Sequence, residues 1–521
     1  MGRKTAWPKT ADPPTLHPGP LTVGLVHLFS RGQMGMEAYR TLVEVHVAGG
    51  LPTFTIAGLP AAAVRESRDR VRAALQTCGH PIPASRVTVH LGPADIPKEG
   101  GRFDLPIALG VLQVENKWKW PVNEYEFIGE LGLSGALRPV LGVLPAVLAA
   151  RDAGRAMILP AGNATEAALV RDARVYPAAH LMEVVRHLNG DAPLKALKPS
   201  APDPAQPFGV DISEVRGHGE GKRALLIAAA GAHHLLMLGP PGSGKSMLAQ
   251  RLITLLPRLG ADDMLCVASI ASVAGAPLAP ILRAERPFRN PHHTATVAAL
   301  VGGGTRPKPG EISLAHLGVL FLDELPEFSR GALEAMREPL ENGTVSISRS
   351  NHRVRYPCEF QLVAAMNPCP CGYLGDGTDR CRCSEARLDR YRSRLSGPIL
   401  DRFDIQVEVP RIPFGELVQP LGEGESAALA RKASTALQRQ LERSGAPNAR
   451  LTNRQLWRTA ALAPQARRVL MKAADRWQLS NRTVTRILKV ARTIADLADA
   501  EALAPEHVAE AIHLRCLDRL L

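Results

Sequence analysis

The most informative segment of this chain is His234-Leu-Leu-Met-Leu-Gly-Pro-Pro-Gly-Ser-Gly-Lys-Ser246. Its apolar half predicts a buried strand, and its glycine-rich half fits the pattern G-x-x-x-x-G-K-[ST] at every fixed position. The residues of this phosphate-binding loop are Gly239, Pro240, Pro241, Gly242, Ser243, Gly244, Lys245 and Ser246. A chance glycine-rich loop is the alternative interpretation.

A loop of this kind turns successive backbone N–H groups toward a phosphate, and the helix that follows adds its positive N-terminal end. Lys245 would reach the β- and γ-phosphates of ATP, and the Ser246 hydroxyl would ligate Mg²⁺. We therefore expect an α/β core built around a nucleotide site.

A second apolar run, residues 318–322, ends in Asp323 and Glu324, 77 residues after Ser246. Phosphoryl transfer needs a carboxylate beside the metal ion and a group that activates the attacking water. The sequence predicts that Asp323 completes the Mg²⁺ shell and that Glu324 polarises the water. A strand that ends in two solvated acids is the alternative.

The chain has 521 residues, which suggests two to four domains. Its 63 Lys and Arg residues exceed its 50 Asp and Glu residues, giving a net charge of +13. This excess favours a polyanionic partner, nucleic acid before membrane. No apolar run approaches the roughly 18 to 20 residues that span a bilayer, and residues 1–20 contain no secretory apolar segment. We expect a cytoplasmic protein with a disordered, proline-rich tail at residues 1–20.

The region from residue 21 to residue 190 has a mixed α/β pattern. Residues 42–47 and 87–91 alternate as half-buried strands do, and residues 61–78 have helical spacing with arginines on an exposed face. Residues 191–207 contain five prolines and no apolar periodicity, so they predict a linker. Residues 411–427 predict a second joint, and the remainder to residue 521 predicts helices. Among these, residues 428–443 are amphipathic, Ser480 caps a helix and Pro505 opens the last one.

Four of the eight cysteines lie close together, at Cys369, Cys371, Cys381 and Cys383. Four thiolates on a short loop can close a tetrahedral zinc site, and six arginines follow or interleave with them. Reduced thiols in an open loop are the alternative. We expect zinc here.

Residues 343–356 alternate like two short strands around Ser350-Asn351-His352, which is typical of a hairpin. Its tip and one arm are basic, with Arg349, His352, Arg353 and Arg355. Cations at this spacing can track a phosphate backbone, although a solvated hairpin is the alternative. Arg306 and Lys308 are further candidate DNA contacts.

The chain resembles the magnesium-chelatase-like ComM/YifB family of AAA+ ATPases. The resemblance rests on residues 91–109, on the segment DISEVRG…KRALLIAAAG, and on residues 318–324, 360–368, 395–404 and 479–497. It implies a Lon-protease-like (S5-type) N-terminal domain at 21–190 and an AAA+ P-loop α/β core at 208–410. The core would carry the four-cysteine insertion as a zinc-finger-like element, and residues 428–521 would form an α-helical lid.

The resemblance also implies roles for single residues. Asn367 would be the first sensor of the γ-phosphate and position the lytic water. Arg402 would be an arginine finger that enters a neighbouring subunit's site, and Arg482, or failing that Arg486, would be the second sensor. Two departures stand out: His218 replaces the family's usual glutamine, and no serine nucleophile follows Pro97-Lys-Glu-Gly100. His292 and His293 follow the family pattern, and no metal is expected there.

The family implies a hexameric ring that encircles DNA and drives branch migration while incoming single strands are integrated in natural transformation. Recombinases would be partners in such a reaction, and no membrane would take part. Two other functions fit parts of the sequence. A magnesium-chelatase-like metallation motor shares the core, but it is not expected to carry the N-terminal domain or the cysteines. An ATP-dependent protease is disfavoured by the missing serine.

Overall fold

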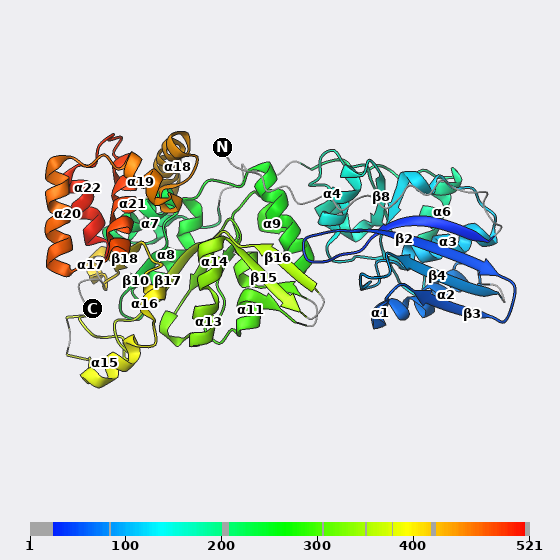
Figure 1. The fold of residues 1–521 in the computed structure, drawn as a ribbon, viewed down its shortest axis with the longest axis horizontal. Helices are drawn as coiled ribbons and strands as arrows, with labels where there is room; N and C mark the ends of the chain where they lie inside the picture. The colour runs from blue at the N-terminus through cyan, green and yellow to red at the C-terminus, as the bar shows by residue number, and fades with distance from the viewer. Residues whose placement is uncertain are drawn as a thin grey trace. The chain divides into compact units, whose positions relative to one another are not determined.

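The computed structural model describes residues 24–82, 85–200, 208–304, 307–349, 352–377, 379–417 and 424–515. The expected tail at residues 1–20, Arg306, and residues 201–207 and 418–423 of the two expected linkers lie outside this set. The chain divides into two compact units, Met1–Ser200 and Ala201–Leu521. In Figure 1 the first unit runs from blue to cyan and the second from green to red.

A seven-stranded sheet organises the first unit, in the order β3-β4-β2-β1-β5-β8-β9. The strands are β1 (Leu25–Arg31), β2 (Arg40–Ala48), β3 (Thr53–Ala57), β4 (Arg86–Gly92), β5 (Tyr125–Phe127), β8 (Ala156–Pro160) and β9 (Val175–Ala178). β2 is antiparallel to β1 and β4, whereas β5, β8 and β9 run parallel to one another. The predicted strands at 42–47 and 87–91 are confirmed as β2 and β4.

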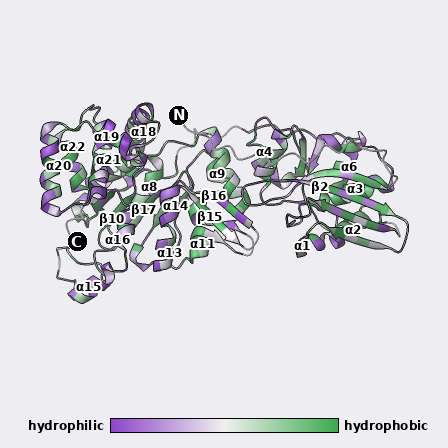
Figure 2. Cartoon of the chain, in the orientation of Figure 1, coloured by the Kyte–Doolittle hydropathy of each residue, from purple (hydrophilic) through white to green (hydrophobic). Residues whose placement is uncertain are grey.

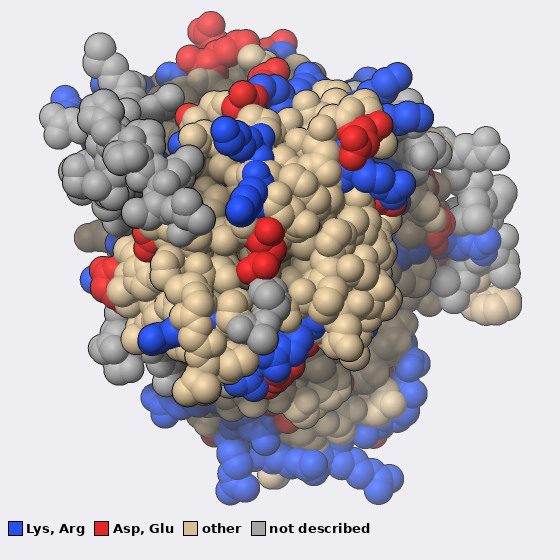
Figure 3. Space-filling model, turned by 90° about the vertical axis from the view of Figure 1, so that its right-hand side faces the viewer, with Lys and Arg blue, Asp and Glu red and all other residues tan. Residues whose placement is uncertain are grey.

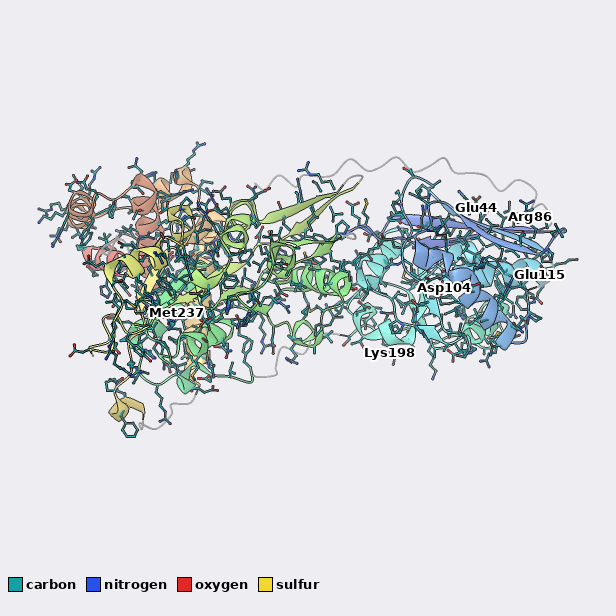
Figure 4. The ribbon with its side chains drawn as sticks, turned by 90° about the horizontal axis from the view of Figure 1, so that it is seen from below. Glu44, Arg86, Asp104, Glu115, Lys198 and Met237 are labelled. Carbon is teal, nitrogen blue, oxygen red and sulfur yellow. The ribbon has the colours of Figure 1, made fainter. Side chains whose placement is uncertain are left out.

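Four helices pack on this sheet: α2 (Ser67–Thr77), α3 (Asp104–Glu115), α4 (Val143–Asp152) and α6 (Leu181–Asn189). The short α1 (Ala62–Arg65) contacts α2, and the short α5 (Ala164–Ala167) contacts α4. The helix predicted at 61–78 is therefore two helices. Its Arg70 is not on a solvated face, because Nε donates to Oδ2 of the fully buried Asp104 at 2.6 Å. Figure 4 labels Asp104 on α3. A buried carboxylate needs such a partner, so Arg70 joins α2 to α3.

A five-stranded parallel sheet organises the second unit, in the order β11-β14-β17-β10-β18. The strands are β10 (Leu235–Leu238), β11 (Phe288–Arg289), β14 (Val319–Leu322), β17 (Gln361–Met366) and β18 (Ile405–Glu408). Every residue of β10, β14 and β17 is buried, as expected for a parallel sheet with both faces covered. Met237 of β10 is labelled in Figure 4, and the labels of β10 and β17 in Figure 2 lie in the middle of the second unit.

The helices of the core are α7 (Gly219–Gly231), α8 (Lys245–Arg251), α9 (Ala261–Ala274), α10 (Ala279–Leu282), α11 (Val297–Val301), α12 (Glu311–Leu314), α13 (Arg330–Ala335), α14 (Arg337–Asn342), α15 (Glu385–Arg392) and α16 (Gly397–Leu400). The predicted helix after the phosphate-binding loop is confirmed as α8. α15 is largely hydrophilic in Figure 2.

Two small antiparallel pairs project from the core. β15 (Thr344–Arg349) pairs with β16 (His352–Pro357), which confirms the predicted hairpin. β12 (Gly302–Gly303) pairs with β13 (Lys308–Pro309). The two pairs touch, because the Tyr356 hydroxyl donates to the carbonyl of Pro307 at 2.7 Å.

Five longer helices end the described chain: α18 (Glu425–Ser444), α19 (Asn453–Thr459), α20 (Pro464–Trp477), α21 (Asn481–Leu497) and α22 (Pro505–His513). A short α17 (Phe414–Leu417) precedes them. The predictions at Ser480 and Pro505 are confirmed: Ser480 accepts from the Thr483 amide, and Pro505 is the first residue of α22. Of the helices that could be examined, none has the length and apolarity to cross a bilayer.

Candidate nucleotide-binding site

The phosphate-binding loop leaves the carboxyl end of β10 and enters α8 directly. Gly244 takes a φ of +90° just before the helix, a conformation that L side chains rarely adopt. Lys245 is buried, and its Nζ donates to the carbonyls of Gly239 and Pro240 at 2.7 and 2.8 Å. The lysine thus folds back over the loop and holds its shape.

The Asp-Glu pair lies at the same edge of the sheet. Asp323 follows β14, and its Oδ2 accepts from the Ser246 hydroxyl at 2.7 Å. Glu324 is half exposed, and its Oε2 lies 3.2 Å from Nδ1 of His293. Ser246 and Asp323, which the sequence predicts as ligands of one Mg²⁺ ion, are thus in direct contact.

Asn367 completes the group from the end of β17, which lies between β10 and β14. Its Oδ1 accepts from Lys245 Nζ at 3.3 Å. Parallel strands bring their carboxyl ends to one edge, and that edge is where α/β sheets bind ligands. Lys245, Ser246, Asp323 and Asn367 come together there from three neighbouring strands.

Burial lowers the pKa of the Lys245 ammonium, while Asp323 and Glu324 act in the opposite direction. His218, which replaces the usual glutamine, lies beside the loop: its Nε2 would be 3.4 Å from a Cβ at Gly244. Burial lowers the pKa of His218 as well. The segment around His218 thus reaches the nucleotide site.

The donor set fits a magnesium nucleotide. The Ser246 hydroxyl and the Asp323 carboxylate offer adjacent hard oxygen ligands, which Mg²⁺ prefers. The buried Ser243 hydroxyl of the loop has no hydrogen-bond partner among the described residues. It is therefore available to a phosphate oxygen.

Arg402 lies at the opposite edge of the same sheet. It precedes β18, whose residue Ile405 is in register with Leu235 at the start of β10. About 10 Å of strand separates this edge from the phosphate-binding loop. Arg402 is buried and forms an ion pair with Glu341. It does not meet Lys245 within one chain.

Arg482 lies near Arg402 and also faces Glu341, at 3.8 Å, with Asp401 at the same distance. Arg486, one turn further along α21, donates to Oδ1 of the buried Asp404 at 2.6 Å. The three arginines line one cavity of about 950 Å³ between the amino edge of the sheet and the C-terminal helices. Arg486 is thus engaged in a structural ion pair, whereas Arg482 is half exposed.

The four cysteines of the insertion converge. Their sulfur atoms all lie within 4.8 Å of one another, and those of Cys369, Cys371 and Cys381 are 3.3, 3.7 and 3.8 Å apart in pairs. Zinc–sulfur bonds of about 2.3 Å at tetrahedral angles separate sulfurs by about 3.8 Å. A hydrogen bond from the backbone of Tyr373 lowers the pKa of the Cys371 thiol to about 6, whereas burial and the neighbouring thiols raise the pKa of Cys381 and Cys383.

The candidate DNA contacts lie on the two projecting strand pairs. On β15–β16 the buried side chains are Val345, Ile347, Val354 and Tyr356. Arg353 and Arg355 point to the other, exposed face, opposite Ser348 and Ser346. Lys308 is exposed on the adjoining β13. Arg306 and the side chain of Arg349 are outside the described part of the chain.

The arginines of the cysteine insertion form a further basic surface. Figure 3 shows Lys and Arg gathered at its lower edge, the level at which α15 lies in Figure 1. The exposed arginines of the insertion itself are Arg380, Arg382, Arg387, Arg390 and Arg394.

Sequence reasoning did not find two contacts of the candidate site residues. The sequence pattern marks His293 only as one of two adjacent histidines, and it does not mark Glu341 at all. Each residue matters through a contact with a residue far away in the sequence. His293 meets Glu324, and Glu341 meets both Arg402 and Arg482. Neither partner can be read from local spacing.

Three family descriptions match consecutive segments of the chain. "Subunit ChlI of Mg-chelatase" matches residues 43–163, and "Magnesium chelatase, subunit ChlI" matches residues 211–417. "Magnesium chelatase, subunit ChlI C-terminal" matches residues 423–515. The second segment contains the phosphate-binding loop, the Asp-Glu pair, Asn367 and Arg402.

Whole-length relatives agree with these matches. The chain is 47% identical over 505 residues to "Competence protein ComM" of Haemophilus influenzae, covering 96% of this chain and 99% of that protein. It is 43% identical to YifB of Escherichia coli, covering 96% and 98%. A part of the chain, 36%, is 24% identical to 20% of the DNA replication licensing factor mcm6 of Dictyostelium discoideum. The chain therefore belongs to the ComM/YifB family of magnesium-chelatase-like AAA+ proteins, whose ATP- and Mg²⁺-dependent chemistry its site residues fit.

Proposed function

We propose that the chain is an ATP-driven DNA motor that works as a hexameric ring and promotes branch migration during natural transformation. One observation carries the proposal: Lys245, Ser246, Asp323 and Asn367 meet at one edge of the sheet, while Arg402 lies at the other. A chain arranged in this way holds half of a hydrolytic site at each edge. Copies stacked edge to edge would complete the site.

The residues divide the chemistry of hydrolysis among them. Lys245 would contact the β- and γ-phosphates once it leaves the loop carbonyls, and Ser246 and Asp323 would hold Mg²⁺, which neutralises phosphate charge. Glu324 would accept hydrogen bonds from the attacking water, with Asn367 orienting it. Arg402 of a neighbouring copy would stabilise the charge of the transition state, and Arg482, which lies near Arg402, would be the second sensor of the γ-phosphate. Arginine fingers raise rates by roughly 10³ to 10⁵.

The DNA part of the proposal rests on charge and on relatives. Arg353, Arg355 and Lys308 present cations on two adjoining projections, as a phosphate-tracking surface requires. The similarity to a DNA replication licensing factor and to a competence protein points the same way. Recombinases that load single strands are the expected partners.

We also propose that the cysteine insertion binds zinc and that the first unit is a Lon-like module without protease activity. The sulfur separations match a tetrahedral site. In the first unit, Lys98 is buried with its Nζ on backbone carbonyls, and no serine occupies positions 101–103. A docking role suits this unit better than acyl transfer.

The second candidate is a metallation motor, because all three matching families describe a magnesium chelatase subunit. Strand displacement on a forked or four-way DNA, with ATP and with a non-hydrolysable analogue, tests the two. If the chain is a DNA motor, it displaces the strand with ATP but not with the analogue, and DNA stimulates its ATP hydrolysis. Hydrolysis that is indifferent to every DNA tested, and unwinding of none, would refute it and favour a protein partner.

A further inference from the structure

The segment between Asn367 and β18 contacts three separate parts of the nucleotide site. We call residues 369–377 and 379–394 the cysteine insertion. It begins two residues after Asn367, turns through the four cysteines and continues into α15. Its contacts with the site are made by Gly372, Tyr391 and Arg394.

Gly372 lies directly against the phosphate-binding loop. It is buried at a φ of +84°, and a Cβ built there would stand 2.4 Å from Cδ of Pro241. Its amide donates to the carbonyl of Cys369 at 3.0 Å, so the turn that touches Pro241 is formed by the first cysteine pair. Only a glycine allows this approach.

Tyr391 reaches the site from the other end of the insertion. Its ring is buried, and its hydroxyl donates to the backbone carbonyl of Asn367 at 3.2 Å. The side chain of the same Asn367 accepts from Lys245. The tyrosine therefore holds the backbone of a residue that contacts the loop lysine.

Arg394 contacts the third part. Its Nη1 donates to Glu327 Oε2 at 2.7 Å, and Glu327 ends the single turn that follows Glu324. This pair is exposed and contributes little stability on its own. It nevertheless shows that the insertion spans from the loop to the Asp-Glu strand.

We propose that the metal-bound cysteine insertion is a positioning element of the ATP site, in which the thiolate cluster holds Gly372 against Pro241 and Tyr391 on Asn367. Loss of the metal would release both contacts without removing any residue that touches the nucleotide. Tyr391 is then a positioning residue. The inference rests on the proposed ATPase activity and on the proposed zinc. It adds that ATP turnover depends on the bound zinc.

Two glycines of the insertion provide a matched test in the full-length protein. Gly372 and Gly375 both have positive φ, of 84° and 76°, so alanine strains the backbone similarly at each. A Cβ at Gly375 meets nothing within 4 Å. Gly372→Ala should lower kcat/KM for ATP about tenfold or more relative to Gly375→Ala, since small displacements of positioned groups cost rate steeply. Equal kcat/KM values for the two variants would overturn the proposal that the contact of Gly372 with Pro241 positions the phosphate-binding loop.

Two tyrosines provide the second test. Tyr391→Phe removes the hydroxyl that holds Asn367, whereas Tyr373→Phe makes the same change on a ring that stacks against Arg380. We expect Tyr391→Phe to lower kcat more than it raises KM, with zinc content and melting temperature unchanged. If Tyr391→Phe has the same kcat as Tyr373→Phe, Tyr391 does not position Asn367.

The third test addresses the metal. Cys383→Ser should lose zinc by elemental analysis and lose most ATP turnover, while Cys266→Ser, on α9, should keep both. A Cys383→Ser protein that lacks zinc yet hydrolyses ATP at the wild-type rate overturns the proposal. Binding of a fluorescent ATP analogue separates the failures. Wild-type protein without nucleotide binding refutes the proposed function and this inference together, whereas active wild type with indifferent variants refutes the inference alone.

Discussion

Two arginines one turn apart on α21 should give opposite results when replaced by alanine. Arg486 donates to Asp404 at 2.6 Å and to the carbonyl of Arg402 at 3.2 Å. Asp404 is 5% exposed, and hydrogen bonds and charge from His233 and Arg486 help to lower the pKa of its carboxyl despite burial. Arg486→Ala leaves this carboxylate without its closest partner.

The cost follows from burial. Breaking a buried ion pair by removing one partner costs about 3 to 5 kcal/mol, because a charge stays behind unpaired. Asp404 keeps the His234 amide at 3.2 Å and His233 at 3.4 Å, so we expect the lower end of that range. Arg482 is half exposed, with its partners at 3.8 Å, and Arg482→Ala should cost no more than about 1 kcal/mol.

Urea unfolding followed by tryptophan fluorescence measures both costs, and ATPase assays of the folded proteins measure the roles. We expect Arg486→Ala to be destabilised and Arg482→Ala to be stable but at least about tenfold slower in turnover. The stability gap between wild type and Arg486→Ala should narrow as the pH falls. A carboxyl with a depressed pKa stabilises the fold fully above its unfolded pKa of about 3.9 and loses that contribution below it.

An Arg486→Ala protein within about 1 kcal/mol of wild type would mean that Asp404 does not depend on its partner. Arg486→Ala could instead be stable but inactive while Arg482→Ala is fully active. That result would make Arg486, and not Arg482, the second sensor.

Three further outcomes are expected. Glu324→Gln should bind nucleotide but abolish turnover, as measured by phosphate release, and normal turnover would contradict the Asp-Glu assignment. Arg402→Ala and Lys245→Ala should each be inactive, but a mixture should regain part of the activity, because one subunit type supplies the arginine and the other the loop; no gain on mixing would mean that Arg402 acts within its own chain. Binding to duplex DNA should weaken with salt by a log–log slope of about −0.9 per neutralised phosphate, and replacing Arg353 and Arg355 by alanine should reduce that slope by about two; an unchanged slope would place the DNA elsewhere.

Local sequence patterns predicted the elements that carry the chemistry. The apolar run 234–238 with its glycine loop, the run 318–322 with its acids and the run before Asn367 each became a buried parallel strand that ends at the site. Such patterns succeed because a strand's burial and a loop's conformation depend on neighbours within a few residues. The hairpin at 344–357 and the cap at Ser480 were readable for the same reason.

The residues of the nucleotide site and their chemistry could therefore be predicted from local sequence alone. Which of these residues contact one another depends on the folded core: Arg402 lies at the edge away from Lys245, Arg486 forms an ion pair with Asp404, and Gly372 touches Pro241. Arg486 and Asp404 are 82 residues apart in the sequence, and Gly372 and Pro241 are 131 residues apart. Contacts at such separations depend on strand order and on how helices pack over a sheet. Those are properties of the whole core, and no local pattern encodes them.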